Sequence, residues 1–214
     1  MLWSDEARVM VRPFRAYADL AAAGDDRPAR TAAARALFFL FVSGAFVSLT
    51  AAGRLVAFHV VSTMVFWSFI PAVQAAVLLG TLRVVGAHPR SPGERAQPSG
   101  AQSKPSSASA LALYFAGHGP WMMFFLLLAG ICLFVPDVHA TMMWLLRRGV
   151  IPALMLTTII WSMVLTYACF REGIGLPRGR ARGATALFYG GFTVVIVGYY
   201  LAMNEIQPQL PWAP

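Results

Sequence analysis

Charged side chains are scarce in this chain of 214 residues. Asp, Glu, Lys and Arg together make up 12% of it, against roughly 25% in a typical soluble globular domain. Hydrophobic residues account for 58%, and the mean hydropathy is +0.62. This composition argues against an ordinary water-soluble fold and indicates an integral membrane protein.

Cysteines and catalytic motifs are also few. Cys132 and Cys169 are the only cysteines and form no CxxC pair, which argues against a disulfide framework and a structural zinc site. We expect both thiols to be buried as small hydrophobic side chains. The chain has no GxSxG, HExxH or Walker-type glycine motif. It therefore predicts no enzyme, no catalytic residue, no metal and no cofactor.

Five uncharged stretches are long enough, alone or with a short apolar lead-in, to cross the hydrocarbon core of a bilayer. Lipid offers the backbone no hydrogen-bonding partner, so each stretch should be helical. The sequence thus predicts an all-α integral membrane bundle of five transmembrane helices. The predicted spans are residues 36–53, 62–82, 120–135, 149–170 and 184–203. A short apolar lead-in at 111–116 precedes the third span, and Gly117-His118-Gly119-Pro120 is predicted to break the helix between them.

The segments between the spans complete the domain organisation. The first two helices fall in residues 36–86 and the last three in 110–203. Between them, residues 87–109 are rich in Pro and Ser and lack apolar periodicity, which predicts a disordered cytoplasmic linker. Residues 171–183 are predicted to form a basic, glycine-bearing loop, and 204–214 a short external tail.

Residues 1–35 contain six arginines and no long apolar run, and they are predicted to form a cytoplasmic amphipathic segment. Ser4 is a candidate N-cap for a helix with Asp5 and Glu6 in its first turn. Apolar residues then recur at helical spacing, with arginines on the other side. This pattern favours a helix lying in the membrane interface, although Pro13 interrupts it and an ordinary packed helix is the alternative. The apolar residues are Met10, Phe14, Tyr17 and Leu20, and the arginines are Arg8, Arg12 and Arg15.

Basic residues alternate along the spans. With the amino terminus inside, fourteen Lys and Arg side chains lie on the cytoplasmic side and three lie outside, as the positive-inside rule requires. The sequence therefore predicts a cytoplasmic amino terminus and an external carboxyl terminus. The net charge of +8 is explained by anionic lipid, and no nucleic-acid partner is predicted. The arginines expected to contact lipid headgroups are Arg8, Arg12, Arg15, Arg178, Arg180 and Arg182.

Small residues recur four apart on two of the predicted spans. Gly44, Ser48 and Ala52 lie on the first span, and Gly198 and Ala202 on the last. Such spacing allows helices to approach closely. The partner of each face is left open: the two faces could meet each other, another membrane protein or a second copy of the chain.

No Asp, Glu, Lys or Arg lies inside the predicted spans, which disfavours active transport. Two alternatives to a structural role remain. An accessory subunit of a respiratory or photosynthetic complex could touch a quinone, haem or pigment through His118, His139 or the tryptophans. A facilitative transporter or channel would need a polar path, for which the spans offer chiefly Gln74, Ser68 and Thr157.

Three stretches carry a family resemblance: Arg12-Pro13-Phe14, Tyr114 to Trp121, and Arg171-Glu172 with residues 175–181. On these the chain resembles the Yip family of multispanning membrane proteins, specifically its bacterial relatives. The resemblance implies five membrane helices with a cytosolic amino terminus, which in eukaryotic relatives serve vesicle trafficking and contact with small GTPases. The Pro/Ser linker departs from the family's compact connection. The resulting hypothesis is a non-enzymatic scaffold in a bacterial inner membrane.

Overall fold

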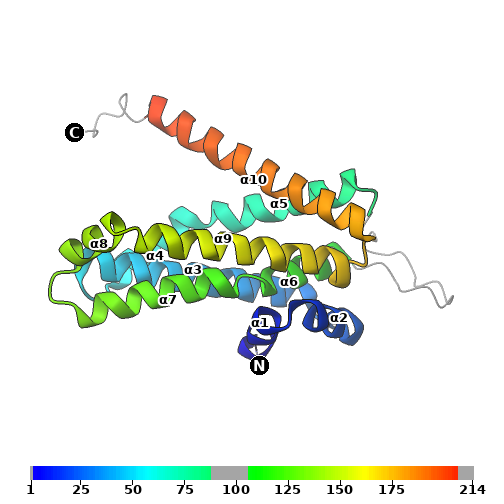
Figure 1. Ribbon diagram of the computed structural model, residues 1–214, viewed down its shortest axis with the longest axis horizontal. Coiled ribbons are helices and arrows are strands. Elements are labelled where there is room, and N and C mark those ends of the chain that lie inside the picture. Colours follow the sequence, from blue (N-terminus) through cyan, green and yellow to red (C-terminus); the bar gives the residue numbers. More distant parts are fainter. Residues whose placement is uncertain (1, 88–105, 207–214) are drawn as a thin grey trace.

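The computed structural model describes residues 2–87 and 106–206, and within these ranges the regular structure is helical, with no strand. Figure 1 shows the helices running largely along one long axis. The predicted all-α class is thus confirmed. Most of the predicted linker and most of the tail, residues 88–105 and 207–214, lie outside the described residues.

Five helical segments are long and apolar enough to cross a membrane. Two of them are broken into a pair of helices, and one ends in a π-helical turn. The segments are α3 (Pro28–Ala52), α4 with α5 (Ala57–Trp67 and Phe69–Val84), α6 with α7 (Ser107–Ala116 and Gly119–Phe134), α9 with η1 (Val150–Ala168 and Cys169–Gly173), and α10 (Arg178–Ile206).

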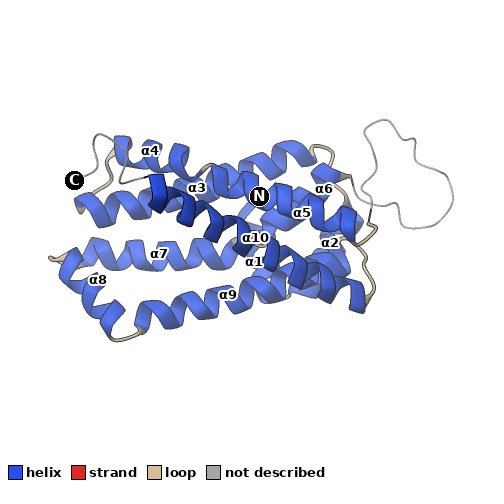
Figure 2. Ribbon diagram, turned by 90° about the horizontal axis from the view of Figure 1, so that it is seen from above, coloured by secondary structure: helices blue, strands red, loops and turns tan. Residues whose placement is uncertain are grey.

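The segments alternate in direction, so the connections gather at two ends of the bundle (Figures 1 and 2). One end holds the amino-terminal helices, the two residues that flank 88–105, and the connection from η1 to α10. We call it the arginine-rich end, because eleven of the fourteen arginines in the described ranges lie on or beside α1 and α2, at the start of α3, at the end of α5, in η1 or on the first turns of α10. The opposite end holds the α3–α4 connection and the short helix α8 (Val138–Arg147).

Several predicted boundaries are wrong by a few residues. The second segment begins at Ala57 instead of 62, and it is interrupted at Ser68. The linker ends before 109, because the Ser106 hydroxyl accepts a hydrogen bond from the Ser109 amide and caps α6. The break predicted between 117 and 120 is present, since α6 ends at Ala116 and α7 starts at Gly119 with Pro120 in its first turn.

The amino-terminal segment forms two helices, so the prediction of one helix capped by Ser4 is wrong. Helix α1 spans Leu2–Val11, which places Ser4 inside it, and α2 spans Pro13–Ala23. Pro13 begins the second helix because proline fits the first helical turn but cannot continue a helix. Both helices lie against the side of the bundle near its arginine-rich end (Figure 1). The alternative of an ordinary packed helix therefore describes them better than a segment free in the interface.

The loop predicted at 171–183 is much shorter in the structure. Residues up to Gly173 continue the fourth segment as η1, and α10 already begins at Arg178. Gly175, at φ +79°, provides the sharp turn between them. The arginines of this stretch consequently lie on the first turns of a helix.

The core is concentrated toward the arginine-rich end. Its largest cluster joins side chains from α1, α2, α3, α5, α6, α9, η1 and α10, with Tyr17, Leu78 and Phe170 among the most deeply buried. A second cluster around Phe39 and Phe125 holds α3 against α7. The third, toward the opposite end, is much smaller and centres on Leu49, Ala129 and Cys132.

Candidate functional site

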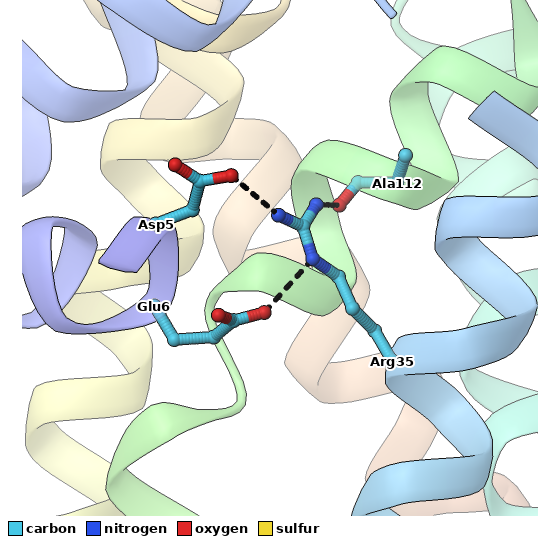
Figure 3. A network of polar contacts seen from close by, with 4 residues as sticks. All are labelled: Asp5, Glu6, Arg35 and Ala112. Atoms are coloured by element: carbon cyan, nitrogen blue, oxygen red, sulfur yellow. Dashed lines mark hydrogen bonds and ion pairs between the residues drawn. The ribbon is translucent and has the colours of Figure 1, made fainter. Parts of the chain in front are cut away.

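A buried arginine lies beneath the amino-terminal helices (Figure 3). The side chain of Arg35, on α3, is 7% exposed. Its Nε donates to Glu6 Oε1 at 2.9 Å, and its Nη2 lies 3.3 Å from Asp5 Oδ2. Its Nη1 donates to the backbone carbonyl of Ala112 on α6 at 2.7 Å. One guanidinium thus ties α1, α3 and α6 together.

Sequence reasoning missed this network. The sequence predicts Arg35 in the polar segment before the first span, but α3 begins at Pro28, so the arginine lies about two turns inside the helix. A buried charge needs a partner, because removing it from water is costly. The partners come from Asp5 and Glu6, about thirty residues earlier, and no local pattern links them. The one signal in the sequence is an acidic pair among arginines, and that pattern by itself indicates only the start of a helix.

The network holds more negative than positive charge when both carboxylates are ionised, since two carboxylates face one guanidinium. Glu6 is 5% exposed, and its Oε2 has no hydrogen-bond partner among the described residues. Burial raises the pKa of Glu6 above its ordinary 4.5, and Asp5 adds to this, while a backbone hydrogen bond and Arg35 oppose it. The two carboxylates are therefore not equivalent: Asp5 is the more exposed partner.

Two glycines let α1 and α2 pack against the break between α6 and α7. A Cβ on Gly117 would lie 2.6 Å from the Tyr17 hydroxyl and 3.2 Å from the Tyr114 carbonyl oxygen. A Cβ on Gly119 would lie 2.6 Å from the Met10 sulfur. Tyr17 is fully buried, and its hydroxyl has no partner among the described residues. The break in the third segment thus serves as the seat for the amino-terminal helices.

A second buried polar pair lies next to this seat. His118, between α6 and α7, is 6% exposed, and its Nε2 lies 3.1 Å from Gln74 Oε1 on α5. The rings of Phe39 and Tyr114 each approach the imidazole edge-on at 5.2 Å between centroids. The sequence alone indicates His118 as a possible cofactor contact and Gln74 as one of a few polar residues in the spans. Only the fold shows that they pair inside the bundle.

The six arginines expected to contact lipid are all exposed and belong to segments of the arginine-rich end. Arg8 forms an ion pair with Asp19 at 2.8 Å across the α1–α2 bend, with both side chains about half exposed. Next to α2, the guanidinium of Arg171 lies over the Phe14 ring at 5.8 Å. The structure brings Arg8, Arg12 and Arg15 to one helical hairpin, while Arg178, Arg180 and Arg182 lie on the first turns of α10.

The small residues predicted to pack behave differently from one another. A Cβ on Gly44 would lie 2.8 Å from the Val60 carbonyl oxygen, so α3 and α4 are in close contact there. Ser48 is fully buried; its hydroxyl accepts from the Val56 amide and donates to the Arg54 carbonyl, which fixes the α3–α4 connection. Ala52 is exposed. Gly198 is also exposed, with open space around it, and the Ala202 side chain lies outside the described structure.

The residues considered for cofactor binding or transport are not brought together. His118 is buried between α6 and α7, whereas His139 is exposed on α8 at the opposite end. Ser68 and Thr157 are exposed and hydrogen bond to carbonyls of their own segments, so they do not line a path with the buried Gln74.

The described residues offer no metal-ligand cluster and no exposed cysteine thiol. Within residues 2–87 and 106–206, no three His, Cys, Asp or Glu side chains are grouped as metal ligands would be. Both cysteines are buried and free, as predicted for small hydrophobic side chains. His88 lies outside the described residues. Comparisons with protein families, curated proteins and solved structures find no match for this chain.

Proposed function

We propose that this chain is a non-enzymatic scaffold of a bacterial inner membrane, Yip-like in its plan, which organises lipid and partner membrane proteins. In this proposal α1 and α2 lie on the cytoplasmic side and the carboxyl terminus is external. The cytoplasmic arginines contact anionic headgroups, and the outward faces of the helices contact acyl chains or partner helices, including those of a second copy.

The observation that carries the proposal is that arginines are concentrated at one end of a bundle whose outer faces are apolar. Large apolar side chains point outward along several candidate spans, and water would solvate them poorly. Acyl chains would solvate them well. Examples are Phe58 and Val65 on α4, Leu156 and Ile160 on α9, and Val194 and Leu201 on α10, all at least half exposed.

The distribution of arginine supports the orientation. At the opposite end the described arginines are Arg54, Arg147 and Arg148, whereas eleven belong to the arginine-rich end. A juxtamembrane arginine contributes about 1 kcal/mol of attraction to an anionic leaflet. Three arginines on the α1–α2 hairpin and three on the first turns of α10 would hold this end at the cytoplasmic surface.

Topology can be tested with single cysteines in a Cys132→Ala/Cys169→Ala background. Ala23→Cys reports on the arginine-rich end and Pro136→Cys on the opposite end; both positions are exposed. We expect an impermeant maleimide to label position 136, but not position 23, in intact cells, and to label both after permeabilisation. Labelling of position 23 in intact cells would contradict the orientation.

Lipid contact and scaffolding need separate measurements. Changing Arg8, Arg12 and Arg15 together to Gln should reduce bound phosphatidylglycerol, counted by native mass spectrometry from mixed micelles. The matched control changes Arg54, Arg147 and Arg148 and should retain it. Cross-linking in cells followed by purification should recover a homo-oligomer or a membrane partner at fixed stoichiometry. Recovery of a bare monomer would contradict the scaffold role.

A further inference from the structure

The Asp5–Glu6–Arg35 network joins a separately attached helical hairpin to the bundle. Helices α1 and α2 connect to α3 only through the exposed residues 24–27, where Gly24 has a φ of +68° and open space around it. The hairpin can therefore move relative to α3 at the cost of its own contacts. These contacts include Arg35 on one side and the Gly117–Gly119 seat on the other.

Docking of α1 encloses an unbalanced charge. Asp5 and Glu6 share the Nε and Nη2 side of one guanidinium, and the remaining nitrogen of Arg35 is occupied by the Ala112 carbonyl. With both carboxylates ionised the cluster carries a net charge of −1. Two carboxylates close together cannot both ionise easily, so one of them binds a proton more tightly. Glu6 is the more buried of the two, and its Oε2 has no partner among the described residues.

We propose that the Asp5–Glu6 pair is a proton-binding site that couples docking of α1 to pH, with one proton taken up on Glu6 Oε2 as the hairpin docks. The proton brings the cluster to neutrality, and Glu6 Oε1 still accepts from Arg35. When the hairpin leaves, both carboxylates regain water and the proton is released. The proton is exchanged with solvent, and no other covalent bond is made or broken.

The sign of the coupling follows from the environment of Glu6. Its pKa is raised in the docked state, mainly by burial, so the docked state binds the proton more tightly than the undocked state. Docking is therefore favoured at low pH and weakens as pH rises above 4.5 toward and through the raised pKa of Glu6. An ordinary salt bridge between Glu6 and Arg35 would show the reverse dependence, being lost in acid.

Other titratable groups near α1 are few. The elements packed on α1 contribute the buried Tyr17 from α2, Tyr114 from α6 and His118 from the break between α6 and α7. Burial raises the pKa of Tyr17 well above 10, so it stays neutral at these pH values. Arg8 and Asp19 pair with each other at the surface. The charged groups that act on Glu6 are Arg35 and Asp5, and His118 is tested separately below.

The experiment measures the distance between α1 and the bundle as a function of pH. Spin labels are placed at the exposed residues Val11, on α1, and Val84, at the end of α5, in the full-length chain with Cys132→Ala and Cys169→Ala. We expect a single docked distance at pH 5. A second, undocked population should grow by up to tenfold per pH unit between the ordinary Glu6 pKa of 4.5 and its raised value in the docked state, because one proton is released on undocking, and it should level off at higher pH.

Variants distinguish the proton site from its neighbours. Glu6→Gln keeps an acceptor for Arg35 and removes the proton, so we expect it to stay docked from pH 5 to 9. Asp19→Asn, which breaks only the surface pair, should keep the wild-type pH dependence. His118→Gln should also keep it. A wild-type distance that does not change with pH, a pH dependence that survives in Glu6→Gln, or one that is lost in His118→Gln would each overturn the proposal.

Discussion

Tyr17 and Phe170 are completely buried near the arginine-rich end of the bundle, whereas α8 at the opposite end has no buried residue. The cause is the amino-terminal hairpin. At one end α1 and α2 add a layer of protein over α6, α7 and η1, and nothing comparable covers the other end in the described structure. A buried ion network is possible only under that extra layer, since an ion pair without it would face lipid or water. The opposite end relies on apolar side chains alone.

Of the changes proposed here, removing Arg35 should destabilise the arginine-rich end the most. Arg35→Ala leaves the buried Glu6 carboxylate and the half-buried Asp5 carboxylate without their counterion, and breaking a buried pair in this way costs about 3–5 kcal/mol. We expect the melting temperature in detergent to fall accordingly. Arg30→Ala is the matched control, because Arg30 is exposed on the same helix; it should stay within about 0.5 kcal/mol. Equal melting of the two variants would show that the network does not hold the hairpin.

A methyl group at the α6–α7 break should have an intermediate effect. Gly117→Ala would push against the buried Tyr17 hydroxyl and the Tyr114 carbonyl, and overpacking of this kind costs about 1–3 kcal/mol. Tyr17→Phe removes a hydroxyl that has no partner, so alone it should be nearly neutral. Combined with Gly117→Ala it should recover much of the lost stability.

The control for these variants is Gly130→Ala, which lies on α7 with open space at its Cβ. It should be neutral or stabilise by up to about 1 kcal/mol, because alanine favours a helix. If Tyr17→Phe fails to rescue Gly117→Ala, the hairpin does not depend on this contact.

The smallest effect should be a difference between the temperatures at which the Cys132 and Cys169 thiols become accessible to a maleimide. Cys169 lies in η1 beside α2. Cys132 lies near the carboxyl end of α7, toward the opposite end of the bundle. Both are at most 3% exposed, so neither should react with a maleimide at room temperature. On warming we expect Cys132 to react first, by about 2–4 °C for each kcal/mol of local stability. The single variants Cys132→Ala and Cys169→Ala separate the signals, and the reverse order would contradict the packing gradient.

Local features of the chain could be predicted from the sequence, whereas contacts between distant residues could not. The break at 117–120 could be predicted because Gly-His-Gly-Pro disfavours an uninterrupted helix locally. The seating of Tyr17 against Gly117 could not, since the two residues are a hundred positions apart. Gly44 and Ser48 were found by their spacing, but the same spacing selected Ala52 and Gly198, which are exposed in the structure. Spacing defines a helix face and does not reveal what covers it.

Composition and the positions of charge were enough to determine the helical class, the five apolar segments and the alternation of arginine between two ends. Those properties depend on solvation and helix length, which each segment carries by itself. The burial of Arg35, its pairing with Asp5 and Glu6, and the meeting of His118 with Gln74 were decided only by tertiary structure. A buried charge or amide is tolerated wherever a partner arrives in space, and distant parts of the chain supplied these partners.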